Sequence, residues 1–141
     1  MNKKLATIIM AGCMTLSSVG SALAAGLGIV DFNFLEQRHP NFNNAVKQYQ
    51  TDTQKYNAEY TEKSKGLTNQ EKQTMANEYN AKLNQRRIAL FKPIDQDVLN
   101  AINKVRIQKG LDYIAAKGYV LSGTVQADIT KEVAREVEKA K

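Results

Sequence analysis

One stretch of the sequence, residues 42–90, restricts the possible folds more than any other, because it predicts a helical hairpin. Residues that can pack against a second helix recur in its first half at alternating steps of four and three, the spacing of a coiled-coil seam. Gly66 then offers a left-handed residue that ends a helix, and residues 68–71 form a capping box that starts another. The seam of the first helix comprises Phe42, Val46, Tyr49, Thr53, Tyr56, Tyr60, Lys63 and Leu67.

The second helix begins at Thr68 and extends well beyond the hairpin. Its apolar positions become dense after Pro93, so this part is expected to lie against a sheet. Pro93 removes one helical hydrogen bond, and we expect a kink near residues 91–93, where the arm joins the rest of the protein. Gly110 closes the helix. Its amphipathic face comprises Met75, Tyr79, Leu83, Arg87, Leu90, Ile94, Val98, Ile102 and Val105.

Short apolar segments outside the hairpin predict a small β body. Residues 27–32 fit one buried strand, and residues 111–115 and 119–122 fit a strand pair joined by a turn at residues 116–118. Residues 124–127 are expected to be a loop. The fold class is therefore α+β, with a long antiparallel helical-hairpin arm on a small sheet.

The segments at the two ends of the body are predicted to be helical. Residues 33–38 can form a short helical turn, which His39 and Pro40 break, because a residue before proline is pushed out of the α region. His39 has no partner that the sequence identifies, so we interpret it as a junction residue rather than a ligand or a base. A last helix starts with Asp128 or Thr130 as its cap.

The N-terminal residues 1–24 have the pattern of a cleaved export signal. Lys3 and Lys4 precede a short apolar run, and residues 22–24 form an A-x-A cleavage site. We therefore expect export and a mature protein that starts directly after this site. Two alternatives stay open: the run could remain as a membrane anchor, or Cys13 could be lipidated.

Export would leave a mature chain without cysteine and with His39 as its one histidine. Thiol chemistry and Cys/His metal clusters are thereby excluded, and no nucleophile–base pair is evident in the local sequence. We expect no enzyme activity, no cofactor and no metal.

Charge separates the arm, residues 41–92, from the body, residues 25–40 and 93–141. The arm holds the whole positive excess of the mature chain, and the body is neutral. A basic projecting arm favours acidic partners or anionic lipid surfaces, although a solvated helix face of mixed charge explains it equally well. Nucleic acid is not an expected partner, because no stacking aromatics accompany Arg86 and Arg87.

The balance of apolar surface predicts self-association. A two-helix hairpin longer than its sheet cannot cover both faces of its seam, and a sheet of three short strands is a small core for a monomer. Copies of the chain are therefore expected to cover one another, in a number that the periodicity does not set.

Several segments, taken in order, carry a family resemblance: residues 28–32, the His39-Pro40 break, the polar hairpin, the step at residues 92–94, and residues 109–113 and 128–133. Together they resemble the Skp/OmpH family of periplasmic chaperones. The resemblance implies a jellyfish-shaped homotrimer, in which strands of three subunits form a barrel-like body and three helical arms surround a cavity. It also implies an ATP-independent holdase in the periplasm that binds unfolded outer-membrane proteins.

The resemblance implies no catalytic residues, but it divides the working residues into three groups. The body positions implied for assembly or core are Ile29, Val30, Phe32, Ile94, Val98, Ile102, Val105, Ile114 and Val120. The candidate client-binding residues, for which seam packing is the alternative interpretation, are Phe42, Tyr49, Tyr56, Tyr60, Met75, Tyr79 and Leu83. The basic residues expected to attract acidic clients are Lys55, Lys63, Lys72, Lys82, Arg86 and Arg87.

Two features depart from the family pattern. The arms look shorter than those of the enterobacterial chaperone, and their seam is rich in Tyr, Asn and Gln. Tyrosine suits a surface that binds many chains weakly, because it offers amphipathic contact area at low side-chain entropy cost. The alternative function is that of an envelope structural or tethering protein, which uses the same hairpin as a spacer. Lipidation of Cys13 would make this protein a lipoprotein.

Overall fold

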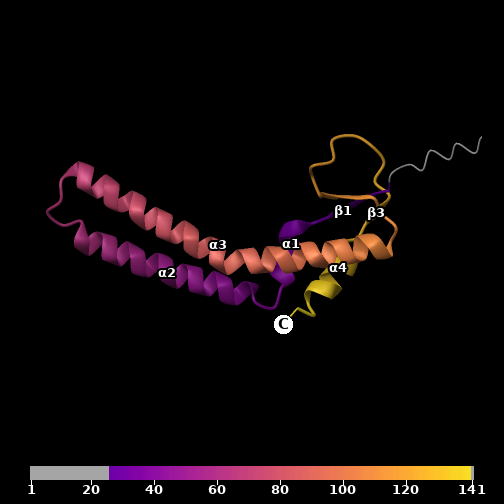
Figure 1. Ribbon diagram of the computed structural model, residues 1–141, viewed down its shortest axis with the longest axis horizontal. Helices are drawn as coiled ribbons and strands as arrows, with labels where there is room; N and C mark the ends of the chain where they lie inside the picture. Colours follow the sequence, from indigo (N-terminus) through magenta and orange to yellow (C-terminus); the bar gives the residue numbers. More distant parts are fainter. Residues whose placement is uncertain (1–25, 141) are drawn as a thin grey trace, which may run out of the picture.

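The computed structural model describes residues 26–140 and shows a helical arm that projects from a small α+β body (Figure 1). The export signal and the lipidation site considered above lie outside these residues. In chain order, the elements are β1 Leu27–Val30, α1 Phe32–Arg38, α2 Phe42–Lys63, α3 Asn69–Gln108, β2 Tyr113–Ala116, β3 Ala127–Asp128 and α4 Thr130–Val137.

The arm is the predicted hairpin, in which α2 and the first half of α3 run antiparallel side by side (Figure 1). Gly66 has a φ of 79°, the left-handed conformation that glycine adopts without strain. Thr68 is the N-cap of α3: its hydroxyl accepts the Glu71 N–H, and the Glu71 carboxylate accepts the Thr68 N–H at 2.8 Å. The predicted capping box is therefore confirmed.

Helix α3 passes through Pro93 without a break and serves both parts of the molecule. Figure 1 shows the helix change direction where the arm meets the body. One missing backbone donor weakens the helix locally, but the neighbouring turns keep their hydrogen bonds. The predicted kink is thus a bend in one continuous helix.

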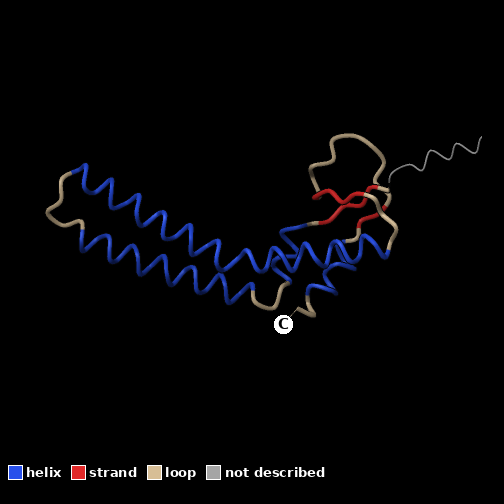
Figure 2. The backbone as a smooth tube through the Cα atoms, viewed as in Figure 1, coloured by secondary structure: helices blue, strands red, loops and turns tan. Residues whose placement is uncertain are grey.

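The sheet differs from the prediction. Its order is β2-β1-β3, and both outer strands pair with β1 in parallel, Gly28 with Ile114 in β2 and with Ala127 in β3. The expected strand pair of residues 111–115 and 119–122 is therefore wrong, and so is a loop that extends through Ala127. Figure 2 shows the three strands beside the second half of α3, with a long loop between β2 and β3.

Burial explains why the predicted strand pair of residues 111–115 and 119–122 does not form. Tyr119 and Leu121 are 82% and 97% exposed, so these residues contribute little to the core. Ile114 packs against the core when β2 pairs with β1, and that pairing is the favourable one. Leu111 lies before β2 and is itself 3% exposed, buried in the core rather than in a strand.

The first strand is shorter than predicted, because the chain turns at Asp31. The Asp31 carboxylate accepts the Phe34 N–H at 3.0 Å and caps α1, so Phe32 begins a helix instead of ending a strand. The N-cap of α4 is Ile129, which makes no side-chain capping bond, so the predicted cap at Asp128 or Thr130 is wrong. The Asp128 carboxylate, one position earlier, still accepts the Thr130 N–H at 3.0 Å.

One hydrophobic core joins the sheet to the helices of the body. Helix α1 contributes Leu35, α4 contributes Val133 and Val137, and the second half of α3 contributes the row from Ile94 to Val105. The dense apolar stripe after Pro93 is therefore buried in the body, as the sequence predicts, but it packs mainly against α4 and α1 rather than against the sheet.

Candidate functional site

The seam of the arm is built from aromatic rings near its base. Phe91 of α3 packs edge to face against Phe42 and Tyr49 of α2, with ring centroids 6.0 and 6.3 Å apart. Such pairs add about 0.5–1.5 kcal/mol beyond the area they bury. Two of the candidate client-binding residues thus lie between the helices, as the seam interpretation expects.

A second aromatic cluster lies farther out along the arm. Tyr79 of α3 lies 5.7 Å from Tyr56 and 6.3 Å from Tyr60 of α2, between ring centroids. Tyr79 is 7% exposed, whereas Tyr56 and Tyr60 are half-buried. The two α2 tyrosines therefore pack with one part of each ring and present the rest to solvent.

Polar contacts surround Tyr79 and fix its orientation. Its hydroxyl donates to the Glu59 carboxylate at 3.0 Å, and this hydrogen bond lowers the pKa of Glu59. Lys63 lies 3.5 Å from the same carboxylate, on the exposed side of α2, so its predicted seam position is wrong. The Lys82 ammonium lies 4.8 Å from the centre of the Tyr79 ring.

Arg86 crosses the seam in place of Arg87. Its Nε donates to the Asp52 carboxylate at 2.5 Å, while Arg87 is exposed and contacts Asn84 of its own helix. The predicted seam position of Arg87 is therefore wrong. Steps of four, three and four from Tyr79 through Leu83 to Arg86 and Leu90 fit a coiled-coil seam better than a step onto Arg87. That spacing is the signal that identifies Arg86.

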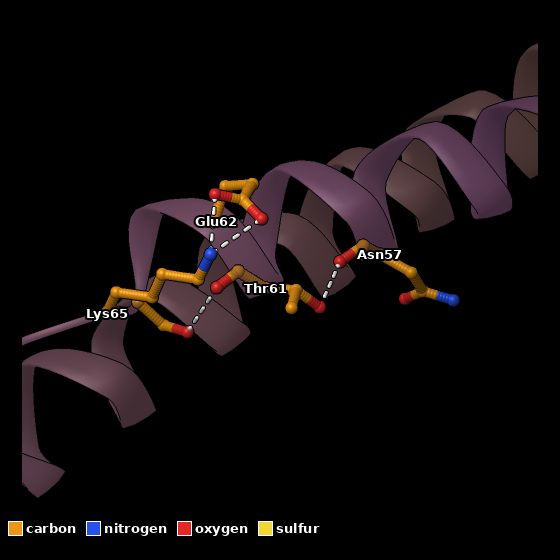
Figure 3. A network of polar contacts seen from close by, with 5 residues as sticks. Asn57, Thr61, Glu62 and Lys65 are labelled. Carbon is orange, nitrogen blue, oxygen red and sulfur yellow. Dashed lines mark hydrogen bonds and ion pairs between the residues drawn. The ribbon is translucent and has the colours of Figure 1, made fainter.

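The end of α2 near the arm tip is held by polar contacts (Figure 3). The Lys65 ammonium donates to both Glu62 oxygens at 2.8 Å, and the Thr61 hydroxyl donates to the Asn57 carbonyl at 2.8 Å. These groups are exposed, so each contact adds little stability. The tip is therefore held by local contacts and not by a buried cluster.

The remaining candidate residues of the arm lie at or beside the seam. Met75 and Leu83 are half-buried, as is Lys72, whereas Lys55 is exposed. Ile88 is the one large apolar side chain of residues 41–92 that is counted among the exposed, at 47%. The outer surface of the arm is therefore polar, with amides, hydroxyls and lysines.

The implied assembly residues occupy two settings in the body. Phe32 and Ile114 pack against the core, and Ile29 and Val120 are half-buried. The members inside the core are Val30, Ile94, Val98, Ile102 and Val105. The exposed large apolar side chains of β2 and of the loop after it, here called the loop patch, are Tyr113, Tyr119, Leu121 and Val125, with exposures of 63%, 82%, 97% and 37%.

The joint between arm and body contains polar residues that the sequence did not pair. His39 caps α1 and is 4% exposed; its Nδ1 accepts the Asn41 N–H at 3.1 Å. Its Nε2 therefore carries the proton and donates to Asp97 of α3 at 3.1 Å. His39 is a junction residue as predicted, but it does have a partner. Asp97 lies 58 positions away, too far for local sequence to reveal.

Within residues 26–140, no three His, Cys, Asp or Glu side chains gather in a way that could hold a metal ion. In the same part of the chain, no helix combines the length and the apolar character that crossing a membrane requires.

The arm, with its aromatic seam and polar outer surface, places the protein in a class of elongated helical-arm proteins carried on a small α+β body. In a comparison of the sequence with protein-family models, the model described as outer membrane protein (OmpH-like) matches residues 67–137, half of the chain. The chain belongs to the OmpH-like family, which is a family of periplasmic chaperone-type proteins rather than enzymes. No curated protein matches the sequence at a significant level.

Proposed function

We propose that this protein is an ATP-independent holdase that binds unfolded outer-membrane proteins in the periplasm after cleavage of its export signal. The observation that carries the proposal is the arm itself. It projects from the body, it carries a net positive charge, and most of its apolar seam residues are half-buried rather than fully enclosed (Figure 1). Such a surface offers many weak contacts and no deep pocket that would fix one ligand.

Client binding would use the rims of the half-buried tyrosines together with the polar outer face. Tyr49, Tyr56 and Tyr60 remain partly accessible while they hold the helices together. A seam that exposes part of each ring can contact an apolar segment without first coming apart. Lys55, Lys82 and Arg87 would raise the rate of encounter with acidic chains, because screened attraction acts before contact.

Assembly into a homotrimer would use the loop patch of the body. Tyr113 and Leu121 lie on or beside a sheet whose outer strand β2 has one unpaired edge among the described residues. An exposed strand edge and exposed large apolar side chains are features that proteins cover by association. The arms of an assembly held at the bodies would then share one enclosed space.

Aggregation of a urea-denatured outer-membrane β-barrel protein tests the proposal. The mature protein, at one trimer per client, should keep the diluted client soluble without ATP. The client would aggregate at the rate of a buffer control if the proposal is wrong.

Charge variants test how the arm contributes. Replacing Lys55, Lys82 and Arg87 by Gln should slow capture of an acidic client by about tenfold at low salt. Replacing the exposed body residues Lys117, Lys131 and Lys139 by Gln is the matched control, and it should slow capture less. Equal effects of the two sets would show that total charge, and not the arm, attracts the client.

The mass of the mature N-terminus separates this function from tethering. A chain that starts near Ala25 supports the soluble holdase. A diacylated Cys13 would instead support an envelope tether.

A further inference from the structure

Two carboxyl groups meet at the joint between the arm and the body. Glu36 lies on α1, and Asp95 lies on α3 two positions after Pro93, where the helix bends. Two ionised carboxylates cannot hydrogen bond to each other, because neither has a donor. Oδ1 of Asp95 is buried and has no hydrogen-bond partner among residues 26–140.

One shared proton removes this difficulty. Burial, followed by the hydrogen bond to Asp95 and repulsion from its charge, raises the pKa of Glu36 to about 7. The pair therefore gains its proton in a pH range that an exposed glutamate would pass through fully ionised.

The charged groups nearby do not neutralise the pair. Among the described residues, no lysine or arginine forms an ion pair with Glu36 or Asp95 within 4.0 Å. The charged groups on the elements packed around the joint have other partners or are exposed. Arg38 pairs with Glu138, the C-cap of α4, and Lys104 pairs with Glu136 of α4. Asp97 pairs with His39, Asp31 caps α1, and Lys92 is exposed.

The neighbouring His39–Asp97 contact is a second link between the same two helices. It is 3.1 Å long, and His39 also holds the turn into α2 through the Asn41 N–H. Helix α1 is thus fastened to α3 at two places, on either side of the row that includes Ile94 and Val98. The Glu36–Asp95 pair is the other of these two places.

We propose that Glu36 and Asp95 form a proton-dependent latch, which holds α1 against α3 while they share one proton and loosens the joint between arm and body when both are ionised. Since the protonated form belongs to the folded state, the latch is closed at acidic pH and is lost as the pH rises through neutrality. The latch concerns the joint alone and does not depend on what the arm binds.

Hydrogen exchange of the mature protein at about pH 5.5 and about pH 8.5 tests the latch, after correction for the intrinsic pH dependence of exchange. Protection in peptides covering residues 32–41 and 91–98 should fall about three- to tenfold at the higher pH, because the pair is only partly shielded from solvent. Protection around Thr68 at the arm tip should not change. Equal loss at the tip, or no loss at the joint, would overturn the proposal.

Two variants remove the titrating group while keeping a donor beside the remaining carboxylate. Glu36→Gln and Asp95→Asn should each make protection at the joint independent of pH and leave the circular dichroism spectrum unchanged. Either variant suffices if the other fails to fold. Glu78→Gln, on the exposed surface of the arm, is the matched control and should keep the pH response.

The His39→Gln variant separates the latch from the imidazole. The pH response should survive in His39→Gln, because the carboxyl pair is intact. A response that survives in Glu36→Gln and disappears in His39→Gln would assign the effect to His39 and overturn the latch.

Discussion

The arm and the body use the same helix in opposite ways. Along the body, α3 buries Ile94, Val98, Ala101, Ile102 and Val105 against other elements. Along the arm, the fully buried residues are Ala45 of α2 and Tyr79 of α3. The body is therefore stabilised by its apolar core, whereas the arm depends on helix length, local capping and a half-buried aromatic seam. Surface that the arm does not bury within its own fold remains accessible to other molecules.

The largest expected difference between the two regions comes from truncating apolar side chains. Leu35→Ala in the body should lower the free energy of unfolding by about 2–5 kcal/mol, because Leu35 is completely buried. Leu83→Ala in the half-buried seam should cost about 1 kcal/mol. Urea denaturation followed by circular dichroism measures both. Equal costs would show that the arm and the body share one core.

Removing the central ring of the arm should loosen the arm and spare the body. Tyr79→Ala loses the contacts with Tyr56 and Tyr60 and removes the hydroxyl that donates to the Glu59 carboxylate. Hydrogen exchange in the arm should accelerate by about tenfold or more, while exchange in α4 stays the same. Tyr119→Ala, which truncates an aromatic side chain 82% exposed on the body, is the control. A loss of protection in α4 would contradict the independence of the two regions.

A smaller effect is expected at the arm tip, where local bonds act alone. Thr68→Ala removes the N-cap of α3 and should cost about 1 kcal/mol, seen as fraying of the first turns. Thr74→Ala replaces an exposed threonine of the same helix whose hydroxyl donates to the Gln70 carbonyl, and it should change stability by less than about 0.5 kcal/mol. Amide exchange over residues 69–76 compares the two variants, and indistinguishable rates would rule out the cap as the source of order.

The smallest effect is a response of the body to acid. Hydrogen bonds from Lys104 and then Lys139 lower the pKa of Glu136 to about 2. Because this pKa lies below the unfolded value, the contribution of Glu136 is present above about pH 4.5 and is lost as the pH falls toward 2. Exchange in α4 should therefore rise modestly in acid, and Glu136→Gln should remove that dependence. Glu62→Gln at the arm tip serves as the control.

These predictions follow from features that the sequence carries to different degrees. The hairpin was readable because each of its signals is local: a seam spacing, Gly66 at the turn, and Thr68 with Glu71 three positions later. The apolar stripe after Pro93 identified the buried half of α3 for the same reason. Arg87 and Lys63 are misplaced in the predicted seam because the spacing of residues within one helix defines the edge of the seam only to within one position.

The sequence predicts less of the candidate site than of the hairpin. The aromatic residues could be identified from the sequence, but their division between seam and solvent depends on the partner helix. Tyr79 is buried because two rings of α2 lie against it, whereas Tyr56 is left half-exposed by the same packing. The contacts of Arg86 with Asp52 and of His39 with Asp97 join positions far apart in sequence, and no local pattern indicates them.

The sequence by itself determined the two arm helices, the Thr68 cap and the turn between them, because those are set by interactions over a few residues. Only the tertiary structure decided the sheet and the joint. The local pattern of residues 111–122 predicts a strand pair, but β2 pairs in parallel with β1, 86 positions earlier, because that arrangement covers Ile114 and buries Leu111. Glu36 of α1 and Asp95 of α3 likewise come together only through the packing of the two helices, and burial there, followed by the effect of Asp95, raises the pKa of Glu36.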